Sequence, residues 1–240
     1  MSKPRFFIDA ELNPGLKLTL PQSVSHHLLT VLRLKPGDSI IAFNGRGGEL
    51  HGVLETISKK SAIVNLTTYD DVSRAASIEV NLGLCVLKRD AMDRAIARSV
   101  ELGIHSLTPL ISEHCTVAHR IIENRHDHWH QVIVAACEQC GLNRLPVLLP
   151  AVTLAGWLKS TNTDLKLIAT QLGSGLPDVS RTGSVAVVTG PEGGFAEAEL
   201  QLASQSGFHP LKLGSRILRG ETAPIVALSA IHQTWGDFSG

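Results

Sequence analysis

The 240-residue sequence lacks any excess of charge, any apolar run long enough to cross a bilayer and any amino-terminal signal pattern. Basic and acidic residues number 22 each, so the chain as a whole has no field that would attract a polyanion. A helical span needs about 20 consecutive apolar residues, and no stretch approaches that length. The opening residues, Met1 to Arg5, are not followed by an apolar segment like that of a signal peptide. We therefore expect a soluble, cytoplasmic protein with no membrane partner.

A complete set of metal ligands is also missing. The four cysteines are Cys85, Cys115, Cys137 and Cys140. The last two form a single C-x-x-C with no second pair to complete a zinc site. Apolar residues recur around this pair at helical spacing, which predicts packed, buried thiols. The histidines of the run 126–130 alternate at a helix start and scatter around its axis, so we expect no metal there.

The first part of the chain, residues 1–72, reads as a small β-rich domain. Short β-forming segments are separated by turn signals such as Asn13-Pro14-Gly15. Strands are predicted at 5–10, 16–20, 39–44, 49–57 and 61–68, and a helix at 25–34. Many short strands at near-even spacing indicate a small barrel.

From residue 73 to 240, strand and helix patterns alternate. Strands are predicted at 77–87, 106–111, 165–169, 184–189 and 209–213, and helices at 90–103, 119–142, 196–206 and 223–235. This alternation predicts an α/β domain with a mainly parallel sheet.

One glycine-rich turn, "GPEGGF" at 190–195, lies between a predicted strand and a predicted helix. Open α/β sheets bind ligands at such strand ends, and glycines allow a backbone to approach a ligand closely. No Lys-Ser or Lys-Thr pair follows, and Pro191 and Glu192 interrupt the G-x-G-x-x-G spacing. We therefore expect an adenosine-containing ligand without phosphates, such as S-adenosylmethionine. A tight turn with no ligand is the alternative.

A second segment, "LGSRILRGETAPIVAL" at 213–228, follows the last predicted strand. It contains two arginines and then Glu221-Thr222 at a helix start, where the threonine can cap the helix and Pro224 is tolerated. The alternative is an ordinary loop with a solvated Arg216 and a structural Arg219–Glu221 pair.

These two motifs, taken together, resemble the signature of the RsmE-type methyltransferases of the SPOUT superfamily. The resemblance extends over the whole chain through "HHLLTVLRLKPGD" (26–38), "SVELGIHSLTPLISEHC" (99–115) and "AACEQCGLNRLP" (135–146). It implies methylation of N3 of a uridine in 16S ribosomal RNA of the small subunit. It also implies a PUA-like β-barrel RNA-binding domain at 1–72, then a trefoil-knotted, parallel-sheet SPOUT domain at 73–240 that forms a homodimer.

The resemblance further implies three loops that enclose a bent S-adenosylmethionine. Carried over position by position, the cofactor-binding residues are Thr170, Gly190, Glu192, Gly193, Gly194, Leu213, Gly214, Ile217, Leu218 and Thr222. The loop at Thr170 departs from the proline-containing version expected for the family.

Chemistry at uracil N3 requires loss of a proton and stabilisation of negative charge on O2 and O4. We expect Arg219 to supply the cation, and Glu221 either to orient it or to act as the base. Phosphate contacts are expected from Arg5, Arg33, Lys88 and Arg89. Asp90 lies four residues before Arg94, so Arg94 and Arg98 are interpreted as a surface ion-pair stripe.

Other functions stay open from the sequence. The protein could methylate another rRNA base or a ribose 2′-hydroxyl, or serve as a non-catalytic RNA-binding assembly factor. A dinucleotide-dependent oxidoreductase is disfavoured, because the glycine fingerprint and its acidic ribose partner are absent.

Overall fold

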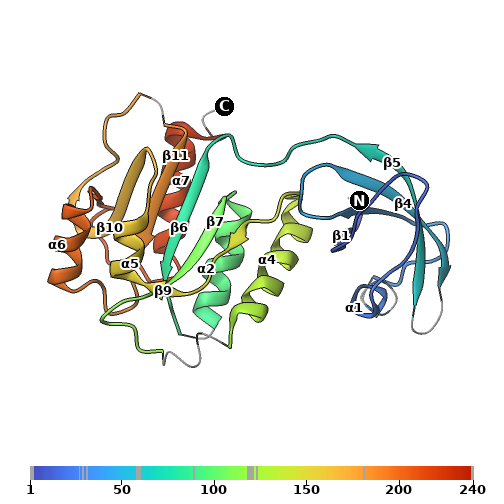
Figure 1. Ribbon diagram of the computed structural model, residues 1–240, viewed down its shortest axis with the longest axis horizontal. Coiled ribbons are helices and arrows are strands. Elements are labelled where there is room, and N and C mark those ends of the chain that lie inside the picture. Colours follow the sequence, from blue (N-terminus) through green and yellow to red (C-terminus); the bar gives the residue numbers. More distant parts are fainter. Residues whose placement is uncertain are drawn as a thin grey trace. The chain divides into compact units, whose positions relative to one another are not determined.

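The computed structural model describes residues 3–26, 28, 30, 32–57, 61–88, 90–117, 122, 124–180 and 182–238. The chain divides into two compact units, each drawn in Figure 1. The N-terminal unit comprises Met1–Ala75 and Cys137–Leu145, and the C-terminal unit comprises Ala76–Ala136 and Pro146–Gly240. Among the described residues, no helix combines the length and the apolar character that crossing a membrane requires.

The N-terminal unit is built on a five-stranded sheet of order β1-β3-β4-β5-β2. Its elements are β1 (Arg5–Phe7), β2 (Lys17–Thr19), α1 (Gln22–His26), β3 (Ser39–Phe43), β4 (Glu49–Ile57) and β5 (Ala62–Asp70). The pair β1–β3 is parallel and the other pairs are antiparallel. In β5, Ala62, Val64 and Leu66 are fully buried while their neighbours are half-buried, which is the period-two pattern of a strand with one face on a core.

A segment distant in sequence completes this unit. The Asn143 side chain donates to the carbonyl of Val72 (2.7 Å) and accepts from the N–H of Arg74 (3.2 Å). The N–H of Phe7 donates to the Glu138 carboxylate at 2.9 Å. Residues 137–145 therefore pack with the β-rich part of the chain, an association that their position along the sequence did not indicate.

The C-terminal unit contains a seven-stranded sheet of order β12-β10-β11-β6-β7-β8, with β9 paired to β7. All of these pairs are parallel. Its strands are β6 (Glu79–Cys85), β7 (Ser106–Ile111), β8 (Val147–Leu148), β9 (Val152–Thr153), β10 (Leu165–Ser174), β11 (Ser184–Thr189) and β12 (His209–Leu211). The predicted α/β class with a parallel sheet is confirmed.

Helices join these strands. They are α2 (Asp90–Glu101), α4 (His126–Cys140), α5 (Leu154–Ser160), α6 (Glu197–Gln205) and α7 (Ala223–Trp235). Helix α2 buries Met92, Ile96 and Val100 on one face and is followed by Gly103 with φ of 77°, the left-handed ending that glycine favours. Helix α4 begins at His126, later than predicted; residues 118–121 and 123 lie outside the described part.

The start of α7 differs from the prediction that Thr222 caps this helix. Pro224 lies in its first turn as expected, but the Thr222 side chain makes no capping hydrogen bond and its backbone is already helical. The turn is closed instead by the N–H of Thr222, which donates to the carbonyl of Arg219 at 2.9 Å. The hydroxyl of Thr222 is therefore not what begins this helix.

Candidate functional site

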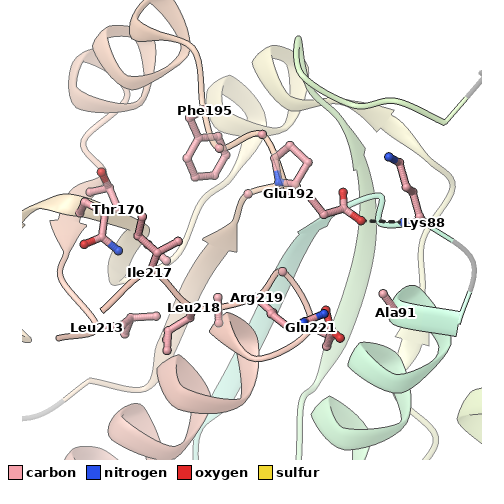
Figure 2. Close-up of a pocket in the computed structure, with 18 of the residues that line it drawn as sticks. Lys88, Ala91, Thr170, Glu192, Phe195, Leu213, Ile217, Leu218, Arg219 and Glu221 are labelled. Carbon is pink, nitrogen blue, oxygen red and sulfur yellow. Dashed lines mark hydrogen bonds between the residues drawn. The ribbon is translucent and has the colours of Figure 1, made fainter. Parts of the chain in front are cut away.

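Four segments of the C-terminal unit surround a cavity of about 750 Å³. Three of them are the regions after β6, β11 and β12, and the fourth is residues 169–172 within β10. They meet at one edge of the sheet because the strands are parallel. Figure 2 shows side chains from these segments facing one space. The lining residues are Lys88, Ala91, Arg94, Ala169, Thr170, Gln171, Leu172, Gly190, Pro191, Glu192, Gly193, Gly194, Phe195, Leu200, Leu213, Ile217, Leu218, Arg219, Gly220, Glu221 and Ala223.

The glycine turn after β11 contributes an open stretch of backbone. Gly194 has φ of 71°, which favours glycine, and its N–H donates to the carbonyl of Pro191 at 2.9 Å. A Cβ at Gly194 would meet nothing within 4 Å, whereas one at Gly190 would lie 3.2 Å from the Phe195 ring. The turn thus leaves room for a ligand over Gly194 while Phe195 closes the space beside Gly190.

Glu192, the acidic residue of the glycine turn, has a structural contact. Its carboxylate accepts a hydrogen bond from the backbone N–H of Lys88 at 3.1 Å, drawn dashed in Figure 2. Lys88 lies between β6 and α2, so the bond joins the glycine turn to the start of α2.

Glu221 pairs with Arg94 and not with Arg219. Its Oε1 lies 3.2 Å from Nη2 of Arg94, and within the described residues no hydrogen bond or ion pair joins it to Arg219. A hydrogen bond from its own backbone N–H, then the charges of Arg94 and Arg219, keep the pKa of Glu221 below its ordinary value. Glu221 is therefore a carboxylate at neutral pH. The pairing of Asp90 with Arg94 that the spacing indicated is wrong, and so is the alternative of a structural Arg219–Glu221 pair.

Most of the predicted cofactor residues come together. Thr170, Gly190, Glu192, Gly193, Gly194, Leu213, Ile217 and Leu218 all line the cavity, as do Arg219, Glu221 and Lys88. Gly214 and Thr222 do not line it. Arg33 is exposed in the N-terminal unit, and Arg89 lies outside the described residues.

Arg5 is not available to a phosphate. Its Nη1 bonds the Glu49 carboxylate at 2.8 Å, and its guanidinium lies 5.3 Å from the centroid of the Phe43 ring. Only 10% of the Arg5 side chain is exposed. The prediction that Arg5 contacts RNA is corrected: this arginine is part of the packing of its unit.

Several cavity residues were not predicted as site residues. Phe195 and Leu200 provide apolar surface, and Arg94 adds a cation. Phe195 stood within the quoted turn, so its aromatic side chain was a usable signal. Arg94 was misassigned because Asp90 has the right local spacing for an ion pair, whereas the actual partner Glu221 is 127 residues distant.

The cysteines and histidines form no site in the part of the chain that the structure describes. No group of His, Cys, Asp or Glu side chains among those residues could hold a metal ion. Nε2 of His128 instead lies 2.8 Å from the Asp93 carboxylate. Burial raises the pKa of the Cys137 thiol to about 12, but Cys140 is exposed, so the expected burial holds for only one member of the C-x-x-C.

Fold and cavity together define a class: an α/β protein with a nucleoside-sized cavity at the carboxyl edge of a parallel sheet, joined to a β-rich unit. A model of the RNA methyltransferase domain matches residues 74–232, and a model of the RNA methyltransferase PUA domain matches residues 20–67. The predicted PUA-like unit followed by a methyltransferase domain is thereby confirmed.

Individual proteins that are similar to this chain are RNA methyltransferases as well. The ribosomal RNA small subunit methyltransferase E of Buchnera aphidicola (from Schizaphis graminum) is 31% identical, with 98% of each chain covered. The crystal structure of ribosomal RNA small subunit methyltransferase E from Neisseria gonorrhoeae, bound to S-adenosylmethionine, is 34% identical with a TM-score of 0.92, covering 99% of this chain and all of that one. A Legionella pneumophila methyltransferase in complex with S-adenosylmethionine has a TM-score of 0.94 at 34% identity, covering 99% and 100%. The chain belongs to the ribosomal RNA small subunit methyltransferase E family.

Proposed function

We propose that this protein transfers a methyl group from S-adenosylmethionine to N3 of a uridine in 16S ribosomal RNA. The observation that carries the proposal is the single cavity lined by both the glycine turn and the arginine-bearing segment before α7. These two motifs carried the family resemblance in the sequence, and the relatives that the chain matches over nearly its whole length are named as small-subunit ribosomal RNA methyltransferases.

The cavity fits S-adenosylmethionine. Its volume lies within the roughly 300–1,000 Å³ of small-molecule sites. Apolar side chains stand exposed on its wall, with 90% of Ile217 and 68% of Leu172 accessible, and these provide surface for an adenine ring. The lining also carries two carboxylates, Glu192 and Glu221, beside three cations, Lys88, Arg94 and Arg219, so the fit to S-adenosylmethionine rests on the volume and the apolar wall and not on net charge.

Each loop has a proposed part in holding the cofactor. Thr170 and the apolar group Leu213, Ile217 and Leu218 would contact the nucleoside, while Gly193 and Gly194 leave backbone accessible. When bound, S-adenosylmethionine supplies an electrophilic methyl group on a sulfonium. Gly214 and Thr222 stay predictions, because neither lines the cavity.

Arg219 is the proposed catalytic residue. Uracil gains negative charge on O2 and O4 as N3 loses its proton, and a guanidinium beside these oxygens lowers the energy of that state. Glu221 does not orient Arg219 directly, because its carboxylate bonds Arg94. As an ionised group on the same wall it can still accept the N3 proton, and we keep it as the proposed base.

RNA is held by both units in this proposal. Residues 1–72 would act as the RNA-binding domain, and residues 73–240 as the catalytic domain. Arg33 and Lys88, both exposed, are the proposed phosphate contacts. A homodimer and a trefoil knot, which the family resemblance implies, stay predictions.

The test is methyl transfer itself. Small ribosomal subunits and naked 16S rRNA from cells lacking the modification are incubated with the protein and methyl-labelled S-adenosylmethionine, and the label is located by mass spectrometry of nucleosides and fragments. We expect 3-methyluridine at one position. Label on another base or on a ribose 2′-oxygen would replace the N3 assignment. Cofactor binding without transfer to either substrate would favour the non-catalytic assembly factor.

A further inference from the structure

We propose that His114 is a positioning residue that holds the glycine turn in its ligand-binding shape. His114 lies in the loop after β7, outside the cavity lining. Its Nδ1 is 3.2 Å from the carbonyl oxygen of Gly193 and 3.2 Å from that of Gly194. Neither the sequence motifs nor the family comparison gives this histidine a role. The proposal rests on the proposed function, because it concerns the turn that would bind S-adenosylmethionine.

Two carbonyl acceptors at one ring nitrogen determine which form of the imidazole is present. Carbonyl oxygens only accept hydrogen bonds, so Nδ1 must carry a proton and donate to both. A neutral His114 is therefore the Nδ1–H tautomer. The same bond also persists in the doubly protonated ring, so the contact does not depend on the charge of His114.

The direction of these carbonyls matters for the cavity. In a trans peptide the C=O of one residue and the N–H of the next point to opposite sides. Because His114 binds the carbonyl of Gly194, the N–H of Phe195 points away from His114. Holding two successive carbonyls on one side thus sets the orientation of the peptide units that the cofactor would meet.

Packing supports the same contact. A Cβ added at Gly193 would lie 2.9 Å from Cβ of His114, so glycine at 193 permits the histidine to approach this closely. The residue before His114 makes a second contact: the Glu199 carboxylate accepts from the N–H of Glu113 (2.8 Å) and also from the N–H of Ala196 (2.9 Å). The loop after β7 is thus joined to the glycine turn by His114 and to the first turn of α6 by Glu113.

Two near-isosteric variants separate donation from packing. In His114→Asn the amide nitrogen occupies the place of Nδ1 and can donate; in His114→Asp an oxygen occupies it and repels both carbonyls. Both contacts are exposed, so water can reach the carbonyls that lose their donor, and we expect S-adenosylmethionine to bind His114→Asp about 5- to 10-fold more weakly than wild type by calorimetry. His114→Asn should stay within about threefold of wild type, as expected when the donor is kept.

Further measurements distinguish a positioning role of His114 from a general effect on the stability of the protein. We expect the KM for S-adenosylmethionine to rise in His114→Asp while kcat at saturating cofactor changes little, and the melting temperature without cofactor to match that of His114→Asn. Nitrogen-15 NMR of the cofactor-free wild type should show Nδ1 protonated. If His114→Asp does not fold, His114→Leu serves as the variant without a donor.

The outcomes are separable. Equal affinities of the Asn and Asp (or Leu) variants, or a proton on Nε2 alone, would overturn the positioning role and leave the proposed function intact. Failure of the wild-type protein to bind S-adenosylmethionine would overturn the proposed function, whatever the tautomer of His114.

Discussion

At the scale of single residues, the charged groups on the cavity wall differ in how far they are already engaged. The carboxylate of Glu192 accepts from the backbone of Lys88, and that of Glu221 pairs with Arg94. The guanidinium of Arg219 has no hydrogen bond or ion pair among the described residues, although it lies near Glu221 in Figure 2. A cation on the wall of the cavity with all donors free can meet a substrate oxygen without first breaking an internal contact.

Replacing Arg219 by alanine should therefore affect the chemical step more than cofactor binding. Removing one preorganised donor from a developing oxyanion typically lowers kcat about 10²- to 10³-fold. Arg219 is exposed and no hydrogen bond or ion pair fixes its guanidinium among the described residues, so we expect Arg219→Ala to lose about 10²-fold, the low end of that range. The dissociation constant for S-adenosylmethionine should change only a few-fold, because the apolar lining and the glycine turn stay in place. Single-turnover methyl transfer and calorimetry measure the two effects separately.

The neighbouring Arg216 provides the matched control. It is exposed and does not line the cavity, and the bond from the Gln171 amide goes to its backbone carbonyl, which alanine retains. Arg216→Ala should keep turnover near that of wild type. Unchanged turnover of Arg219→Ala at saturating RNA would remove Arg219 from the mechanism.

At the scale of elements, one buried carboxylate ties together strands that are not neighbours in the sheet. Glu49 at the start of β4 bonds Arg5 of β1 at 2.8 Å, with β3 between these strands, and it bonds Arg74 at 3.3 Å. The Glu49 side chain is 2% exposed. Burial raises the pKa of this carboxyl, but hydrogen bonds and charge from Arg74 and Arg5 outweigh it and leave the pKa below 4.5.

Glu49→Gln should destabilise the N-terminal unit. Removing one partner of a buried ion pair costs about 3–5 kcal/mol, because the other charge stays buried without compensation. Since the folded pKa of Glu49 lies below its ordinary value of 4.5, its stabilisation is fully present above that pH and is lost as pH falls through the folded pKa. The gap between wild type and variant in urea denaturation should thus be constant above about pH 5 and shrink in acid.

Glu55 is a suitable comparison within the same strand. It pairs with Lys17 at 2.8 Å, but the two side chains are 33% and 62% exposed. An exposed pair contributes at most about 1 kcal/mol, so Glu55→Gln should leave the urea midpoint nearly unchanged. Equal losses in Glu49→Gln and Glu55→Gln would show that burial of the first pair is not what makes it strong.

Elements with strong local patterns could be predicted from the sequence, and weakly patterned ones could not. Strands β7 and β11 and helix α7 have the predicted bounds because each is a continuous buried or helical pattern between clear turn signals. The short α5 was missed, although Thr153 caps it by accepting from the N–H of Gly156 at 3.2 Å. Strands β8 and β9 have two residues each, which leaves no period to detect.

In the candidate site, too, local features could be predicted from the sequence and long-range contacts could not. The glycine turn could be identified because its function lies in local backbone properties. The bonds Arg94–Glu221 and Lys88–Glu192 join residues 127 and 104 positions apart, and no pattern along the chain encodes them. The segment 137–145 likewise joins the N-terminal unit through Asn143, a contact that depends on how the chain folds back.

At the scale of the whole molecule, RNA binding must rely on local contacts. Equal numbers of basic and acidic residues leave no net charge to attract RNA from a distance. Each phosphate contact then makes a measurable contribution to the salt dependence of binding, because it releases counterions from the RNA. A single well-placed arginine can thus be identified from the slope of affinity against salt concentration.

Arg33 is the proposed phosphate contact in the N-terminal unit, and its backbone conformation is unfavourable for arginine. Its φ is 54°, in the left-handed region, and the next residue is held in place because the N–H of Leu34 donates to the carbonyl of Leu28 at 3.0 Å. Glycine usually occupies this left-handed position, and a residue with a side chain costs about 1 kcal/mol there. A strained, exposed arginine where glycine would be more stable points to a role in binding.

Arg33→Gly should consequently separate stability from RNA binding. Relief of the left-handed strain should raise stability by up to about 1 kcal/mol in urea denaturation. Loss of one phosphate contact should weaken binding to 16S rRNA and reduce the slope of log K against log salt by about 0.7. Arg98→Ala is the control, because it removes the same positive charge. Arg98 is already paired with Glu101 at 2.6 Å, so its replacement should leave the slope unchanged. Equal slopes for wild type and Arg33→Gly would show that Arg33 contacts no phosphate and that its strained backbone needs another explanation.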